Sequence, residues 1–287
     1  KVKILNYSQK IEWQYEQLLN VVWKRIYEQD KKSSLFNGFD IEQKEMDVIF
    51  IDMIVPQIIG DISSEKIKQA FILGGQPGSG KSAFARELLK TNKNIVFING
   101  DDLRAYHPKY YFYLKQNDIE AADMTQAVCN NWIESLIQEC IRLELSFIVE
   151  GTMRKKEVPM KTAEMLHHDG YTVNLVVIST PYEVSLMSLE YRYKELKKLG
   201  QPARFTKKES HDEAYQNIES TVEDLVRSPF FKKFFIYTRS KGMFSEATFE
   251  AEEKENVLQN FKKGRLPLVG DKKDTLFEVK TNPLPFK

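Results

Sequence analysis

Residues 73–82 read Leu73-Gly74-Gly75-Gln76-Pro77-Gly78-Ser79-Gly80-Lys81-Ser82, and this stretch decides the fold of the chain. Positions 75–82 match the pattern G-x-x-x-x-G-K-[ST], which forms a phosphate-binding loop when it follows a strand and opens a helix. That context is present, because the apolar run 70–73 precedes the loop and a helical pattern begins at Ser82. A glycine-rich turn with an incidental lysine would need strand, loop and helix to agree by chance. The sequence therefore predicts that the chain binds a nucleoside triphosphate.

Each part of this loop has a chemical task in phosphate binding. Its glycines let backbone N–H groups converge on phosphate oxygens, and the start of the following helix adds positive potential. Lys81 is expected to reach the β- and γ-phosphates, and the hydroxyl of Ser82 is expected to ligate Mg²⁺. The predicted nucleotide-binding set is Gly75, Gln76, Pro77, Gly78, Ser79, Gly80, Lys81 and Ser82.

The pattern around the loop predicts an α/β fold. Five short apolar or β-branched runs occur at residues 70–73, 95–98, 147–149, 173–178 and 234–237, and the first four alternate with longer helical patterns. Near-continuous apolar strands separated by helices indicate a mostly parallel sheet that is covered on both faces. We therefore expect a five-stranded P-loop kinase fold. Helical patterns also cover residues 41–59, ending at Gly60, and residues 182–199 and 207–227, joined by a loop at 200–204.

The ends of the chain differ in pattern from this central region. Residues 9–29 carry apolar residues at helical spacing and lead into the polar linker 30–34, while the stretch after Asn260 is rich in glycine and proline. We predict an N-terminal helical extension at 1–34, a kinase-like domain at 35–262 and an extended tail at 263–287.

The composition limits the partners of the protein. The 287 residues include 42 Lys and Arg against 41 Asp and Glu, which gives a net charge of +1 and no global field to attract nucleic acid or an anionic membrane. The longest apolar run, at 48–59, is too short to cross a bilayer. Cys129 and Cys140 fall in one predicted helix, and no Cys/His cluster has metal-ligand spacing. We expect reduced thiols and a cytoplasmic protein that contacts neither nucleic acid nor membrane.

The class of P-loop protein is narrowed by three features that the sequence lacks. It contains no Asn-Lys-x-Asp guanine-reading motif, no apolar strand ending in the Asp-Glu pair of ATPase motors, and no second nucleotide-binding half. Small-molecule kinases remain. They need a residue that orients the acceptor hydroxyl and extra positive charge around the transferred phosphoryl group.

Polar residues suited to these tasks follow the second and third predicted strands. Asp101 or Asp102 could orient an acceptor hydroxyl or take its proton, although an Asp pair after a strand is also a common turn or helix cap. Glu150 directly follows the third run and could place a carboxylate beside the same site, although capping or salt bridging is the alternative role. Arg192 and Arg204 could clamp phosphates, although single arginines are more often solvated surface residues.

Taken together, these motifs resemble the zeta toxin family of bacterial toxin–antitoxin systems. The resemblance covers about residues 36–245 and is carried by the loop, the segment from Asp101 to His107-Pro108, Val149-Glu150-Gly151-Thr152-x-Arg154, and the order Arg192, Arg204, His211-Asp212. It implies a toxin kinase that uses ATP and Mg²⁺ to phosphorylate the 3′-hydroxyl of the aminosugar in UDP-N-acetylglucosamine or a related UDP-N-acetylsugar. That product would block the synthesis of cell-wall precursors.

The resemblance also implies a role for individual residues. Lys81 and Ser82 would hold ATP and Mg²⁺, and Asp101 would be the base, although Asn99 replaces the acidic residue that the family has two positions earlier. Arg192 and Arg204 would contact the phosphates. The sugar-nucleotide pocket would be lined by Glu134, Glu150, Thr152 and Arg154, of which Glu134 is matched by spacing alone.

The leading segment 1–34 precedes the point at which the family usually begins. It could be a fused antitoxin element that covers the ATP site, or an amphipathic helix that only packs on the domain, in which case a separate small helical antitoxin would be the partner. Two other functions stay open: an ATP-binding regulatory or interaction protein, and a P-loop kinase of another small metabolite.

Overall fold

The computed structural model describes residues 41–200, 203–240 and 243–267, and these fall into two compact units. The sheet unit comprises residues 62–98 and 138–192 and the described residues from 206 onward. The helical unit comprises 99–137, 193–205 and the described residues up to 61. The boundary falls within two helices, α8 (Gln126–Arg142) and α10 (Tyr182–Lys198). The predicted extension 1–34 and all of the predicted tail beyond residue 267 lie outside the described residues.

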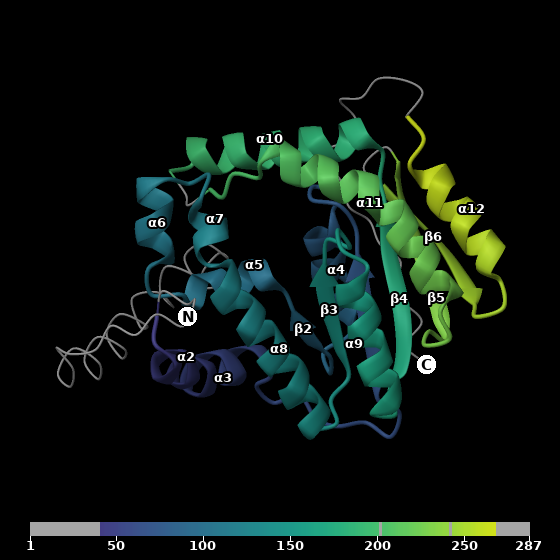
Figure 1. Ribbon diagram of the computed structural model, residues 1–287, viewed down its shortest axis with the longest axis horizontal. Coiled ribbons are helices and arrows are strands. Elements are labelled where there is room, and N and C mark those ends of the chain that lie inside the picture. Colours follow the sequence, from purple (N-terminus) through teal and green to yellow (C-terminus); the bar gives the residue numbers. More distant parts are fainter. Residues whose placement is uncertain (1–40, 201–202, 241–242, 268–287) are drawn as a thin grey trace. The chain divides into compact units, whose positions relative to one another are not determined.

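The sheet unit is built on a six-stranded sheet with the order β2-β3-β1-β4-β5-β6 (Figure 1). Its strands are β1 (Gln69–Gly74), β2 (Val96–Ile98), β3 (Phe147–Gly151), β4 (Thr172–Ser179), β5 (Lys233–Ser240) and β6 (Met243–Glu250). The first five are parallel to one another, and β6 is antiparallel to β5. The predicted α/β fold with a mostly parallel sheet is therefore confirmed.

The sixth strand was not predicted. Parallel strands buried on both faces are recognised as continuous apolar runs, but β6 is an antiparallel strand at the edge of the sheet and needs no such run. Its residues 246–250 are partly or fully exposed, and Glu246, Thr248 and Glu250 alternate with less polar neighbours. A partly exposed edge strand of this kind therefore leaves no continuous apolar run in the sequence.

Helices cover both faces of the sheet. On one face, α4 (Lys81–Thr91) packs Phe84 and Leu88 against Phe71 and Leu73 of β1. Because side chains alternate along a strand, the neighbouring positions face the other way. There α9 (Glu157–His168) packs on β4 and β1, and α12 (Lys254–Gly264) packs on β4 and β5. The hydroxyl of Ser179 in β4 donates to the carbonyl of Phe261 in α12 at 2.6 Å.

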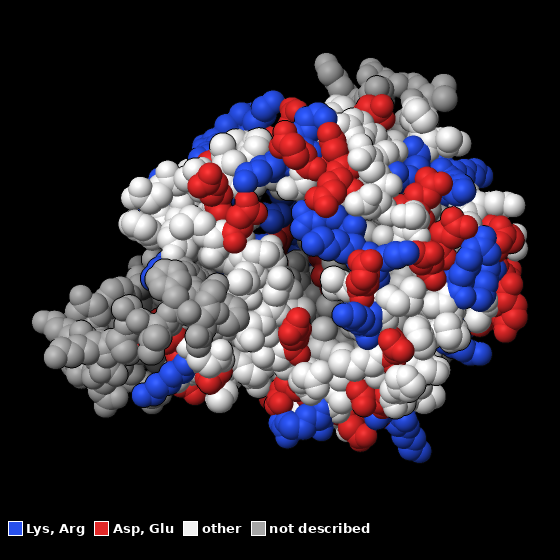
Figure 2. All heavy atoms as spheres, in the orientation of Figure 1, with Lys and Arg blue, Asp and Glu red and all other residues white. Residues whose placement is uncertain are grey.

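The remaining long helix of the sheet unit, α11 (Lys208–Arg227), buries one apolar face and packs beside α12. Together α10 and α11 confirm the helices predicted at 182–199 and 207–227. None of the helices in the described part of the chain combines the length and apolar character needed to span a bilayer. On the face drawn in Figure 2, the described acidic and basic side chains are intermixed, in keeping with the balanced charge.

The helical unit begins with one continuous helical stretch. It runs through α2 (Gln43–Ile49), a π-helical turn (Phe50–Ile54) and α3 (Val55–Ile58), and it ends at Gly60, whose φ of +53° allows its N–H to reach the carbonyl of Val55. The predicted helix at 41–59 is thus confirmed. Buried Trp132 of α8 donates to the carbonyl of Met46 at 3.2 Å. The other elements are short: α5 (Gly100–Leu103), a 3₁₀ turn (Arg104–Tyr106), α6 (Tyr110–Gln116) and α7 (Ala121–Met124).

Candidate functional site

The phosphate-loop segment has the predicted strand–loop–helix geometry. Strand β1 ends at Gly74 and α4 begins at Lys81, so the glycine-rich residues form the whole connection. Gly78 and Gly80 have φ of +78° and +106°, backbone conformations that residues other than glycine rarely adopt. A Cβ added to Gly78 would lie 2.1 Å from the carbonyl oxygen of Ser185. The loop therefore needs glycine for its backbone angles and for its close approach to α10.

Buried polar contacts hold this loop against the junction of β4 and α10. Gln76 is fully buried, and its Nε2 donates to the carbonyl of Thr180 at 2.7 Å. In return, the hydroxyl of Thr180 donates to the carbonyl of Ser79 at 3.1 Å. Two loop residues are thus fixed from outside the loop, which pre-organises the backbone for phosphate.

Lys81 folds back over the loop that precedes it. Its Nζ donates to the carbonyl of Gly75 at 2.6 Å and to that of Gln76 at 3.1 Å, and its side chain is 7% exposed. The same Nζ lies 3.9 Å from Oε1 of Glu150. A buried ammonium group is costly without such partners. The loop therefore carries one compensated positive charge where a phosphate chain would be bound.

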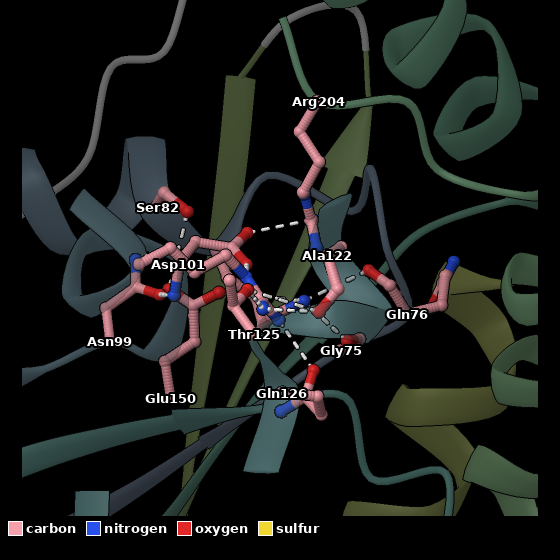
Figure 3. Close-up of polar contacts among 12 residues, drawn as sticks. Gly75, Gln76, Ser82, Asn99, Asp101, Ala122, Thr125, Gln126, Glu150 and Arg204 are labelled. Atoms are coloured by element: carbon pink, nitrogen blue, oxygen red, sulfur yellow. Dashed lines mark hydrogen bonds and ion pairs between the residues drawn. The ribbon is translucent and has the colours of Figure 1, made fainter. Parts of the chain in front are cut away.

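Glu150 enters this group from the neighbouring strand. The parallel register pairs Glu150 of β3 with Leu73 of β1, so its carboxylate lies at the edge of the sheet from which the loop emerges. The hydroxyl of Ser82 donates to Oε2 of Glu150 at 3.4 Å (Figure 3). Hydroxyl and carboxylate oxygens are the ligands that Mg²⁺ prefers, and P-loop proteins commonly use a loop Ser or Thr with a strand-end carboxylate. The residues present therefore fit a magnesium-bound nucleotide.

The two residues predicted to act beside Glu150 lie on either side of Met153. Met153 is buried and has φ of +53°, and its side chain fills the space where a Cβ on Gly74 would stand. Thr152 and Arg154 are both exposed. Arg154 forms an ion pair with Glu213 of α11 at 3.4 Å. The turn thus directs both polar side chains to the surface of the sheet unit, while Met153 fixes the turn.

An arginine of the sheet unit that the sequence analysis did not single out, Arg239, contacts the phosphate loop. The predicted Arg192 is exposed on α10. Arg239, near the end of β5, is buried and donates through Nη1 to the carbonyl of Gly78 at 3.4 Å and to the hydroxyl of Ser188 at 3.0 Å. Burial lowers the pKa of Arg239. No motif marks this position, and only the pairing of β5 with β4 could have indicated it.

In the helical unit, Asp101 lies in the first turn of α5. Asn99 precedes this turn as its N-cap, and its Oδ1 accepts the N–H of Asp101 at 2.9 Å. The side chain of Asn99 therefore supplies the helix cap, a role that the sequence analysis left open for Asp101 and Asp102. The carboxylate of Asp101 is thus not needed as the cap.

Two arginines hold the carboxylate of Asp101 (Figure 3). Arg204 donates to Oδ2 at 2.8 Å, and Arg104 donates to Oδ1 at 3.4 Å. Arg104 is buried and is itself fixed by three acceptors: the carbonyl of Ala122, the hydroxyl of Thr125 and Oε1 of Gln126, all within 2.7 Å. Arg104 thus connects Asp101 to the helices of this unit, a role that the sequence analysis missed.

The loop that carries Arg204 is tied down by Asp118. The carbonyl of Asp118 accepts the N–H of Phe205 at 3.4 Å, and its carboxylate accepts from Tyr193 at 2.8 Å and pairs with Lys197. Lys197 first, and Tyr193 after it, lower the pKa of Asp118. Sequence patterns gave no sign of this residue. Glu134, predicted to line a sugar pocket, is exposed on α8 in the same unit.

The sequence model of the family described as Zeta toxin matches residues 57–248. The chain belongs to the zeta toxin family. It is 33% identical over 198 residues to Toxin PezT of Streptococcus pneumoniae, covering 68% of this chain and 78% of that protein. It is 31% identical over 173 residues to Toxin zeta of Enterococcus hirae, covering 59% of this chain and 60% of that one.

Solved structures give the same result for this zeta toxin family member. The structure of the PezAT chromosomal toxin–antitoxin system of Streptococcus pneumoniae matches with a TM-score of 0.64 and 26% identity, over 78% of this chain and 96% of the other. The AvrRxo1-ORF1:-ORF2 structure with ATP matches with a TM-score of 0.53 and 14% identity, over 79% and 73%, and this likeness concerns the fold alone. The family resemblance predicted from the motifs is confirmed.

Proposed function

We propose that this zeta toxin family protein is a kinase that transfers the γ-phosphate of ATP to the 3′-hydroxyl of the aminosugar in UDP-N-acetylglucosamine or a related UDP-N-acetylsugar. The observation that carries the proposal is the convergence of Lys81, Ser82 and Glu150 at the end of a glycine-forced loop. Membership of a toxin family agrees with a product that blocks cell-wall precursor synthesis.

On the donor side, the loop N–H groups and Lys81 would bind the phosphates of ATP. Phosphoryl transfer has a loose transition state, so positioned positive charge contributes most of the rate increase. Mg²⁺, when bound, would neutralise charge on the β- and γ-phosphates, and Ser82 with Glu150 is the pair suited to hold it. Arg192 and Arg204 would add positive charge at the phosphates.

On the acceptor side, Asp101 would orient the sugar hydroxyl and take its proton. The new bond joins the sugar oxygen to the γ-phosphorus, the bond from that phosphorus to the β–γ bridging oxygen breaks, and ADP leaves. Arg104 supports this role because it fixes the carboxylate from a buried position. Glu134, Thr152 and Arg154 would bind the sugar nucleotide, as the family resemblance implies.

The proposed partner is an antitoxin. PezAT is a toxin–antitoxin system, and this chain resembles its toxin over most of the toxin's length. In this chain the antitoxin element would be residues 1–34, acting in cis, or a separate small helical protein. Growth arrest by the full chain and by a form that lacks residues 1–34 would distinguish these, because a cis element makes the full chain the less toxic of the two.

The proposed reaction is tested by incubating the purified full chain with ATP, Mg²⁺ and UDP-N-acetylglucosamine. Mass spectrometry should show a sugar nucleotide heavier by one phosphoryl group, and Lys81→Ala should not form it. The same assay without residues 1–34 guards against inhibition in cis. ATP binding without transfer in either form would contradict the kinase proposal for this acceptor and favour a nucleotide-dependent interaction protein.

A further inference from the structure

A buried chain of hydrogen bonds in the sheet unit leads from α11 to the phosphate loop. His211 of α11 is fully buried, with Nε2 2.8 Å from the hydroxyl of Ser185 in α10 and Nδ1 3.1 Å from Oδ1 of Asp212. Ser185 is fully buried as well, and its hydroxyl accepts Nε2–H of Gln76 at 3.3 Å. Gln76, Ser185, His211 and Asp212 therefore form one connected set, the Ser185–His211 chain.

The direction of the protons in this chain follows from Asp212. Tyr182 donates to its Oδ1 at 2.8 Å and Lys208 pairs with its Oδ2. Lys208 first, with His211 and Tyr182 after it, lowers the pKa of Asp212. The carboxylate is therefore an acceptor, so Nδ1 of His211 carries a proton, and in the neutral imidazole Nε2 is then the acceptor.

The hydroxyl of Ser185 connects the imidazole to the loop. Its proton can reach Nε2 of His211, and it is shared with the carbonyl of Tyr182 at 2.9 Å. Its oxygen then has a lone pair for the amide N–H of Gln76. The other acceptor for that amide is the carbonyl of Thr180, so both contacts require the nitrogen of Gln76 to face α10. The Thr180 carbonyl and the Ser185 hydroxyl thus favour the same amide orientation, and the second contact links Gln76 to α11.

A Ser–His–Asp set also occurs in hydrolases, but this one is not built for nucleophilic attack. The Ser185 hydroxyl is fully buried, and the loop lies against the Ser185 backbone so closely that a Cβ on Gly78 would meet its carbonyl oxygen at 2.1 Å. A substrate carbonyl has no approach to this oxygen. The same packing makes the position of Ser185 decisive for the backbone of the loop.

We propose that His211 is a positioning residue for the phosphate loop: through Ser185 it fixes Gln76 and the adjoining backbone in the phosphate-binding conformation. The inference rests on the proposed use of a nucleotide. It assigns to the His211-Asp212 pair a role in nucleotide affinity, although neither side chain lies within the loop.

The test compares three variants on the same helix. His211→Leu removes the side-chain acceptor of the Ser185 hydroxyl and leaves it the backbone carbonyls of Pro181 and Tyr182, whereas His211→Gln retains an amide oxygen that can replace Nε2. Leu225→Ala serves as the matched control, because Leu225 is fully buried on α11 but lies outside the chain of hydrogen bonds. All three should lower stability, so a merely structural role of His211 predicts similar behaviour of the three variants.

Two measurements separate positioning from stability. Hydrogen exchange in nucleotide-free protein should accelerate in the peptide covering residues 74–80 for His211→Leu, and much less for the other two. Calorimetric titration with Mg²⁺ and a non-hydrolysable ATP analogue should give a Kd about tenfold higher for His211→Leu, as expected for one lost buried hydrogen bond. His211→Gln and Leu225→Ala should stay within about threefold of the parent.

The inference is overturned if His211→Leu leaves loop exchange unchanged, or if Leu225→Ala alters the loop equally. Combining Ser185→Ala with His211→Leu should add little to either single effect, because both substitutions interrupt the same chain of hydrogen bonds. Fully additive effects would also overturn the inference. The exchange measurement needs neither nucleotide nor acceptor. Failure of the protein to phosphorylate UDP-N-acetylglucosamine would thus contradict the proposed function. The positioning role of His211 would still be decided by the exchange measurement.

Discussion

The phosphate loop and the Asp101 group differ in how their charged side chains are held. Lys81 is 7% exposed and is fixed by backbone carbonyls of its own loop, whereas the Asp101 side chain is 41% exposed and is held by two arginines. Buried contacts to backbone leave few alternative conformations, while partly exposed ion pairs are weakened by water and salt. The loop is therefore held by buried contacts, whereas the Asp101 carboxylate is partly exposed to solvent although buried Arg104 anchors one of its oxygens.

This difference predicts two classes of variant. Changes at the loop should impair nucleotide binding and turnover together. Changes in the Asp101 group should impair turnover and leave nucleotide binding nearly intact. Substitutions at Lys81, Asp101, Glu150 and Asp118 test that division, and each is matched by a substitution at a nearby residue of the same charge.

The largest effect is expected at Lys81. If Lys81 contacts the transferred phosphate as proposed, Lys81→Ala should lower the transfer rate at least about 10³-fold, the scale on which a single stabilising cation acts in phosphoryl transfer. Binding of the ATP analogue should weaken as well. Lys90→Ala, which removes an exposed lysine paired with Glu87 on the same helix, should change neither. A normal transfer rate for Lys81→Ala would show that the lysine of the phosphate loop takes no part in phosphoryl transfer.

Asp101 comes next. Asp101→Asn retains shape but cannot take a proton, and it should lower kcat by about 10²- to 10⁴-fold, the usual contribution of a general base. The Kd for the ATP analogue should stay the same, as the division between the two regions requires. Asp102→Asn is the control and should keep most of the activity. The opposite result would assign the acceptor role to Asp102.

A substitution at Glu150 tests whether this residue helps to hold Mg²⁺ or lines the sugar-nucleotide pocket. The family resemblance implies a pocket for the sugar, but in the structure the carboxylate lies 3.4 Å from the hydroxyl of Ser82. If it helps to hold magnesium, Glu150→Gln should raise the Mg²⁺ concentration for half-maximal rate about tenfold or more. Glu144→Gln, an exposed glutamate paired with Lys68, should not. An unchanged Mg²⁺ requirement with a higher KM for the sugar nucleotide would instead support the pocket role.

The strand–loop–helix form of the phosphate loop could be predicted from sequence because it is local. Residues 75–82 are contiguous, their glycines are required by backbone angles, and the strand before them is an uninterrupted apolar run. The central strands and long helices were predictable for the same reason, since burial on both faces imposes a continuous pattern. The edge strand β6 has no such pattern and was missed.

The supporting residues could not be predicted because their partners are distant in sequence. Arg239 contacts Gly78, 161 positions away, and Gln76 contacts Thr180, 104 positions away. A single arginine or aspartate looks the same in sequence whether it is solvated or buried. Only folding decides that Arg104 is enclosed by three acceptors while Arg192 is exposed. Motifs identify groups that react, and tertiary structure identifies groups that hold them.

The smallest effect is expected at Asp118. This residue anchors the loop that carries Arg204 through its contacts with Phe205, Tyr193 and Lys197. Asp118→Asn should lower kcat by about fivefold or less, the scale of a partly exposed ion pair, and should leave nucleotide affinity unchanged. Glu120→Gln, a nearby exposed carboxylate, is the control. A change in nucleotide affinity would show that the two regions are not separable in this way.

The same variant has a distinct dependence on pH. Lys197 and Tyr193 lower the pKa of Asp118 below its ordinary value of 3.8, so the folded protein favours the ionised form more than the unfolded chain does. This stabilisation is present above the ordinary pKa and is lost as the pH falls through the lowered one. The free energy of unfolding of the parent should therefore exceed that of Asp118→Asn by a constant margin between about pH 5 and 7, and the margin should shrink below about pH 4. Denaturant titrations across this range measure it, and a margin that grows on acidification would mean that Lys197 and Tyr193 do not stabilise the carboxylate in solution.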